Sequence, residues 1–314
     1  MPTLLRKILS SIIPLTLLSV CLEAQTIDDG VMIPRHTLFT GDVYSHDAWD
    51  HYWETHLNRV NGNLGTVTTQ TNTFSANYGI TNHLDFIALV PYVWTNASEG
   101  VLSGMQGFQD ITLAAKYNFF ERPFTKHGTL RAIGVVSGSI PLTNYEPDFQ
   151  PLSIGNQSKR IAAHLTLNYQ THRGWFGNAT SSYTWRHDVT IDTPYYYTNG
   201  QLFLTNDVSM PEVFDYIVSG GYYKHGLMAY GFMEQQRTQG GGDIRRQDVP
   251  FISNHVNFSR VGALVMYPLP IPKLHNLAVE FAYGYIFDGR NVGQSTTYTT
   301  ALMYTVHFPG SPKQ

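Results

Sequence analysis

The sequence predicts an all-β protein, a transmembrane antiparallel up-and-down β-barrel of about twelve strands with both termini on the periplasmic side. Segments of about ten residues alternate apolar and polar side chains, as at 110–120 and 276–288, which is typical of strands with two different faces. Short connections alternate with long ones, as do the periplasmic turns and extracellular loops of outer-membrane barrels. The chain also starts with an export signal, so we expect it in the bacterial outer membrane.

Residues 1–24 have the composition of a secretory signal peptide. Arg6 and Lys7 precede an apolar stretch, and we expect cleavage after Ala24. Cys21, the only cysteine, lies inside this segment, so the exported chain is expected to contain no disulfide. Lipidation of Cys21 is an alternative that the bulky residue before it disfavours.

Composition excludes several classes of protein. Charged residues make up only 14% of the chain and aromatic residues 13%, whereas soluble domains carry about 25% charged residues. The net charge of −3 gives no basic footprint, so we expect no nucleic-acid partner. The remaining alternative is a secreted β-sandwich, which would need polar outer faces where Leu, Phe and Tyr stand here.

The chain divides into the signal peptide, a periplasmic and exposed lead-in at 25–36, the barrel at 37–308 and a short tail at 309–314. The first strand has the weakest pattern, so ten or fourteen strands remain possible. In the strand at 276–288, by contrast, every second residue from Leu277 to Phe287 is apolar. We expect strands at 37–47, 66–78, 83–95, 108–120, 129–141, 158–171, 175–190, 212–223, 226–236, 254–269, 276–288 and about 298–308.

The connections and the aromatic residues set the expected orientation. The turns at 79–82, 172–174, 224–225 and 270–275 are short, whereas 96–107, 142–157, 191–211 and 237–253 are long. Aromatic residues at strand ends are typical of girdles against outer-membrane lipid and lipopolysaccharide. They are Trp94, Phe287 and Tyr298 towards the loops, and Phe119, Tyr169, Trp175, Tyr267 and Phe308 towards the turns.

Phe308 ends the last expected strand. An aromatic residue at this place is the signal that the barrel insertion machinery recognises, so we expect that machinery as a partner. The alternative is an ordinary strand end.

Four short motifs carry a family resemblance. They are YGITNHLD at 78–85, VPY at 90–92, GFQD at 107–110 and AKY at 115–117. Together they resemble the outer-membrane family labelled "putative meta-pathway of phenol degradation" or "transporter". GSIPLT at 138–143 is similar to the family's next element, although Asn144 stands where the family has glycine. The resemblance implies a barrel that lets small, often apolar or aromatic compounds cross the outer membrane.

Charges of both signs are expected to face the lumen. A barrel of about twelve strands encloses a narrow lumen whose lining decides what passes. The charges would form either a constriction that orients solutes or a network that neutralises itself and plugs the lumen; the cost of unpaired charges favours the network. Strand parity selects Asp110, Lys116, Arg160, His164, Arg186, Asp188, Asp215 and Glu280.

Pro91 interrupts an otherwise apolar strand. Proline removes a ladder hydrogen bond, and a closed barrel has no edge to hold it, so we expect a bulge or kink. Its neighbours Ile87, Leu89 and Val93 share one face. The hypothesis is a wall opening or an apolar lumen patch that passes a hydrophobic compound; the alternative is a bulge with no role in transport.

Other activities have weaker signals. His46, Asp47, Asp50, His51, Glu54 and His56 have spacings that suit a divalent metal, but they lie in an expected loop, and we predict no metal site. His255 with Ser253 or Ser259 is the nearest approach to a lipid hydrolase, without a nucleophile elbow. No cofactor motif is present. We therefore predict a channel rather than an enzyme, with a structural or surface-binding barrel as the alternative.

Overall fold

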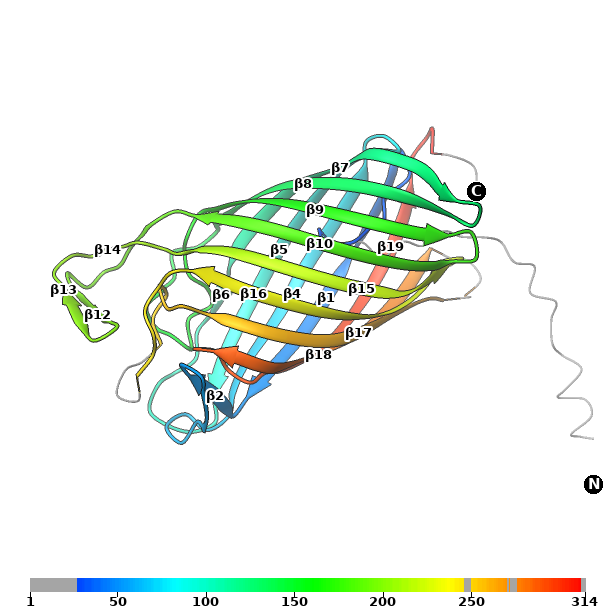
Figure 1. The fold of residues 1–314 in the computed structure, drawn as a ribbon. Helices are drawn as coiled ribbons and strands as arrows, with labels where there is room; N and C mark the ends of the chain where they lie inside the picture. The colour runs from blue at the N-terminus through cyan, green and yellow to red at the C-terminus, as the bar shows by residue number, and fades with distance from the viewer. Residues whose placement is uncertain (1–26, 246–249, 270, 272–275, 312–314) are drawn as a thin grey trace, which may run out of the picture.

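The computed structural model describes residues 27–245, 250–269, 271 and 276–311, and twelve long antiparallel strands close into a barrel (Figure 1). Each strand pairs with its neighbours along the chain, and the first strand pairs with the last. Pairing of β4 with β5 completes the ring. The wall consists of β1 (Thr37–Trp49), β4 (Val67–Gly79), β5 (Leu84–Ala97), β7 (Asp110–Thr125), β8 (Gly128–Pro141), β9 (Arg160–Thr171), β10 (Trp175–Arg186), β15 (Glu212–Lys224), β16 (Leu227–Gln239), β17 (Asn257–Pro268), β18 (Leu277–Arg290) and β19 (Thr296–His307).

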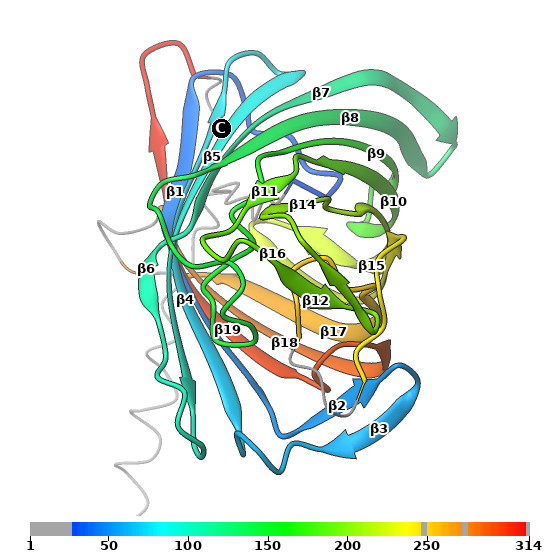
Figure 2. The ribbon, with the colours of Figure 1, turned by 90° about the vertical axis from the view of Figure 1, so that its left-hand side faces the viewer.

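All long connections lie at one end of the barrel, which we call the loop end; the other is the turn end, where β1 begins and β19 finishes (Figure 1). Viewed from the loop end, short loop strands lie across the opening (Figure 2). These strands are β2 (His51–Glu54), β3 (Leu57–Val60), β11 (Val189–Thr190), β12 (Tyr196–Thr198), β13 (Gln201–Phe203) and β14 (Asp207–Val208). A further short strand, β6 (Gln106–Phe108), pairs with β5 and belongs to the wall sheet.

The two faces of each wall strand differ as the alternation predicted. On β18, Phe281 is 60% exposed on the outer face. Ala278, which has the opposite parity on the same strand, is fully buried on the inner face. Large apolar side chains remain exposed around the outer wall, on strand after strand. A belt of this extent is far larger than the apolar patches of soluble proteins and suits a lipid environment. Among the described residues no helix is long and apolar enough to cross a membrane.

Two expected strands are divided in the structure. The strand expected at 108–120 is split into β6 and β7, with Gln109 between them. The strand expected at 175–190 ends at Arg186, and Val189–Thr190 belongs to a separate two-stranded sheet with β14. Asp188 is therefore not on a wall strand, so the expectation of a strand up to residue 190 is wrong and the parity that placed Asp188 in the lumen does not apply. Its carboxylate instead accepts a hydrogen bond from the Met210 amide at 3.3 Å.

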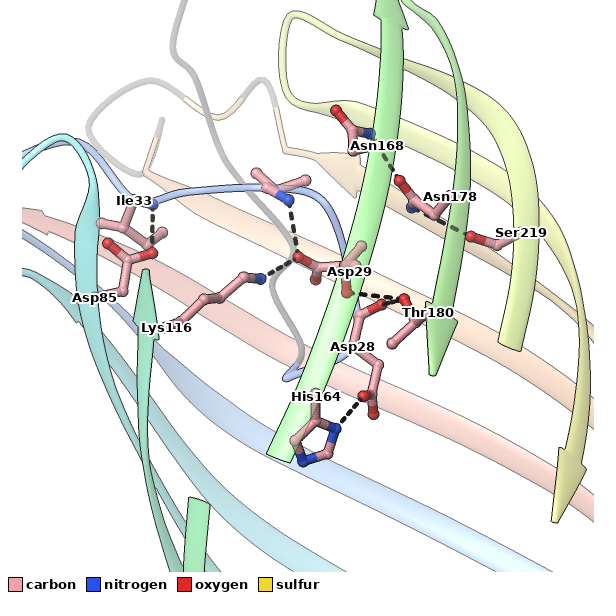
Figure 3. Close-up of polar contacts among 12 residues, drawn as sticks. Asp28, Asp29, Ile33, Asp85, Lys116, His164, Asn168, Asn178, Thr180 and Ser219 are labelled. Carbon is pink, nitrogen blue, oxygen red and sulfur yellow. Dashed lines mark hydrogen bonds and ion pairs between the residues drawn. The ribbon is translucent and has the colours of Figure 1, made fainter. Parts of the chain in front are cut away.

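The expectation of an exposed lead-in is wrong for the described part, residues 27–36. Asp29 and Ile33 are buried, because this segment lies inside the barrel against the inner faces of the wall strands (Figure 3). Val31 and Ile33 join an apolar cluster with inward side chains of the wall, including Phe39, Met228 and Met266. The segment, which we call the lumen segment, thus narrows the lumen of the twelve-stranded barrel.

Candidate functional site

The lumen segment is held to four wall strands by polar contacts (Figure 3). The Asp29 carboxylate lies 2.6 Å from Nζ of Lys116, which is fully buried. Nearer the turn end, the Ile33 amide donates to Asp85 Oδ2 at 2.9 Å. Because these charges lie inside the lumen, pairing lowers the cost of removing them from water.

Asp28 anchors the same segment to β9 and β10. Its carboxylate lies 2.7 Å from Nδ1 of His164, and its carbonyl oxygen accepts a hydrogen bond from the Thr180 hydroxyl at 2.9 Å. The backbone also approaches the wall closely: a Cβ on Gly30 would lie 2.5 Å from Cγ of Asn168. A side chain at position 30 would therefore push the segment away from β9.

The predicted lumen residues fall into three groups. Lys116 and Arg160 form ion pairs inside the barrel, Arg160 with Asp110 at 3.0 Å, and the His164 ring contacts the Asp28 carboxylate. Asp215 accepts a hydrogen bond from the Ser182 hydroxyl at 3.3 Å. Glu280 and Arg186 lie on the inward-facing parity of β18 and β10, and neither forms an ion pair or a hydrogen bond of its side chain within the described residues.

Several inward charges were missed by the sequence reasoning. Asp85 alternates with the exposed Phe86 on β5, so strand parity alone would have found it. Arg260 and Glu234 form an ion pair between β17 and β16, and the same parity argument applies to them. Asp28 and Asp29 had no such signal, because an irregular segment has no parity.

The ladder is interrupted opposite Pro91, as expected. Pairing of β5 with β7 runs up to Leu89, and pairing with β6 resumes at Tyr92. Gln109, left out of both strands, donates its amide to the Pro91 carbonyl at 3.0 Å and accepts from the Leu142 amide at 3.0 Å. The extra residue therefore forms a bulge facing the proline, but hydrogen bonds still close the wall there.

The apolar residues near Pro91 lie inside the barrel and are covered. Ile87 is 2% exposed and packs with Ile27 of the lumen segment. Val93 packs with Tyr145 and Ile154 from the loop after β8. Leu89 is half-buried and packs against the cluster that contains Ile87.

The loop end is organised by Asn291, which has a positive φ of 53°. Its side chain accepts hydrogen bonds from the Thr55 and Ile244 amides and donates to Asp243 and to the His255 carbonyl. One asparagine therefore connects the hairpin of β2 and β3 to the loop that follows β16.

Arg290 supports this arrangement through a two-bond contact with Asp243, at 2.8 and 2.7 Å. Hydrogen bonding by the Arg290 guanidinium lowers the pKa of the Asp243 carboxyl to about 2. The folded-state pKa is below that of an unfolded chain, so the contact stabilises the loops above about pH 4 and is lost as the pH falls towards 2. The loops therefore keep this support throughout the neutral range.

Three of the cavities formed by the described residues lie along the inside of the barrel. One of about 400 Å³ is at the turn end, beside Pro34, Asn82 and Glu121. The second, of about 190 Å³, adjoins residues 28–31 of the lumen segment. A third, of about 430 Å³, lies at the loop end. The second cavity has a mixed wall. Aliphatic and aromatic side chains form one part of it, and about half of its lining residues are polar or charged, including Asn168, Glu234 and Arg260; the apolar part includes Phe176, Ile217, Met228, Tyr230 and Phe232.

The other candidate sites do not assemble. Among the described residues no three His, Cys, Asp or Glu side chains are placed to hold a metal; of the 46–56 group, His51 pairs with Asp50 at 2.8 Å. Ser259 accepts a hydrogen bond from Gln235, and within the described residues the His255 ring forms no hydrogen bond with either candidate serine.

Comparison with solved structures places the fold among bacterial outer-membrane barrels. The structure of the COG4313 outer membrane channel from Pseudomonas putida F1 matches with a TM-score of 0.68 and 13% identity, over 90% of this chain and all of that chain. The NanC porin matches with a TM-score of 0.44 and 11% identity, over 84% and 98% of the two chains. The corresponding values for the KdgM porin are 0.42, 8%, 85% and 99%.

No curated protein matches the chain in sequence. The model of one family, described as "Putative MetA-pathway of phenol degradation", matches residues 55–269. This range covers more than half of the chain and includes the motifs that carried the resemblance. The chain therefore belongs to this family.

Proposed function

We propose that this chain is an outer-membrane channel for the passive passage of small hydrophobic or aromatic compounds. The observation that carries the proposal is the cavity of about 190 Å³ inside the barrel, where aliphatic and aromatic side chains form one part of a wall that also carries polar and charged groups. Small-molecule sites combine apolar and aromatic walls with polar groups that orient the ligand. The P. putida structure with the same fold is named an outer membrane channel, and the family's description refers to phenol degradation.

The route runs along the lumen, past the lumen segment, between the loop-end and turn-end cavities. Partial filling of the lumen excludes large solutes, since the passage is narrower than the barrel alone would leave. Small rings fit the apolar part of the cavity wall, whereas hydrated sugars would lose hydrogen bonds to water there.

Ile217→Trp is expected to reduce uptake of a neutral aromatic compound several-fold, because the larger side chain fills the cavity. Uptake of naphthalene into lipopolysaccharide-containing proteoliposomes measures the effect, with glucose as the excluded solute. Val218→Trp is the matched control, since Val218 is the next residue and lies on the outer face, 42% exposed. Equal uptake by both variants and the unsubstituted protein would contradict passage through this cavity.

A lateral route at Pro91 is a second candidate, favoured by the bulge at Gln109. On this route, apolar compounds leave the lumen through the wall where the ladder changes strand. Pro91→Val adds a ladder donor, so naphthalene uptake is expected to fall while ion conductance in planar bilayers is unchanged. Unchanged uptake by a correctly inserted Pro91→Val barrel would sink the lateral route and leave the lumen route standing.

A further inference from the structure

The cavity of about 430 Å³ at the loop end combines aromatic walls with two arginines. We call it the vestibule. Its volume is that of a typical small-molecule site. The lining residues on which the argument rests are Trp49, Tyr52, Phe251, Ile252, Arg160 and Arg186.

The two arginines lie side by side on the inner face of the wall. Arg160 and Arg186 are direct cross-strand partners on β9 and β10, and like charges in this position repel. Only Arg160 has a close carboxylate, that of Asp110 at 3.0 Å. The same carboxylate also accepts a hydrogen bond from the Tyr145 hydroxyl at 2.7 Å, which holds it against Arg160.

Arg186 has no hydrogen-bond or ion-pair partner within the described part of the chain. The buried Nε atoms of Arg186 and of Arg160 both lack an acceptor there. Asp215 attracts the Arg186 guanidinium electrostatically but forms no ion pair with it. A buried donor without an acceptor is costly, and a charge without a close counter-charge is poorly compensated. An anion in the vestibule would supply an acceptor and a close counter-charge to Arg186.

We propose that the vestibule binds small aromatic carboxylates, an inference that rests on the proposed channel function and narrows its substrate class. The carboxylate pairs with the planar guanidinium of Arg186, a geometry that suits two parallel hydrogen bonds. The ring lies among Trp49, Tyr52 and Phe251, whose faces and edges favour aromatic contacts. Arg160, already paired with Asp110, adds to the positive potential.

Calorimetric titration of the full-length refolded protein with benzoate and with benzamide, its neutral analogue of the same shape, tests the proposal. Benzoate is expected to bind saturably and more tightly than benzamide. Arg186→Gln is expected to weaken benzoate binding about tenfold, as loss of a charge-assisted hydrogen bond implies. Benzamide binding should be unaffected. Arg131→Gln is the matched control, since Arg131 faces Glu121 at the turn end.

Equal benzoate affinity in the unsubstituted and Arg186→Gln proteins would overturn the proposal, and so would equal affinity for benzoate and benzamide. Arg186→Lys serves as a second variant if Arg186→Gln does not refold. It keeps the positive charge but lacks the planar guanidinium that forms two parallel hydrogen bonds, so benzoate should bind more weakly. Unchanged benzoate affinity in this variant would also overturn the proposal. Naphthalene uptake without benzoate binding would reject the vestibule and leave the channel function. Benzoate binding at Arg186 in a protein that transports neither compound would reject the channel function alone.

Discussion

Replacing residues 27–33 by a Gly-Ser sequence of the same length is expected to raise single-channel conductance several-fold. These residues carry the contacts that hold the lumen segment in place: Asp28 with His164, Asp29 with Lys116, and the Ile33 amide with Asp85. A Gly-Ser sequence keeps none of them and pays a large entropy cost for staying ordered. The lumen would then be limited by the wall side chains alone.

Planar-bilayer recording of the refolded protein measures this conductance. The control replaces the exposed loop residues 99–103 in the same way, which alters a segment of the loop end outside the lumen. Conductance should stay at its original value in the control. A lumen-segment variant that conducts no better than the control would show that the wall itself, and not the segment, sets the narrowest point.

The wall of the barrel could be predicted because the direction of each side chain depends only on its position within its own strand. Each strand alternates between lipid and lumen, so side-chain parity placed Asp110, Lys116 and Glu280 inward from the sequence alone. The same reasoning failed at Asp188, two residues past the end of β10, because parity has meaning only while the strand continues. The alternation of apolar and polar residues does not show where a strand ends, so predictions based on parity are least reliable there.

The lumen segment could not be predicted for a different reason. Asp28, Asp29, Gly30 and Pro34 have the composition of an exposed linker, and nothing local marks them as buried. Their partners are far along the chain: Lys116 is 87 residues from Asp29, and His164 is 136 residues from Asp28. The inward position of Lys116 was the available signal, since a buried charge requires a counter-charge.

Lys116→Met is expected to release the lumen segment while leaving the barrel intact. Removing one member of a buried ion pair typically costs about 3–5 kcal/mol when nothing relaxes. Here the lumen segment can detach from the wall, and Asp29 then returns to water. The variant's loss of stability therefore cannot exceed the free energy with which the segment binds to the wall. Hydrogen exchange should therefore quicken at the Ile33 amide, which Asp85 protects in the docked state, while the thermal transition of the barrel stays in place.

Exchange measured on peptides from residues 27–36 and from the wall strands separates the two effects. Arg131→Met is the control, because its pair with Glu121 is partly exposed and should contribute only about 0–1 kcal/mol. Reversing the pair, with Asp29→Lys and Lys116→Asp together, should restore part of the protection, since the attraction survives the exchange of partners. If Lys116→Met instead lowered the transition of the whole barrel and left Ile33 protected, the lysine would be a structural member of the wall, and the segment would be held by its apolar contacts with Phe39 and Met266.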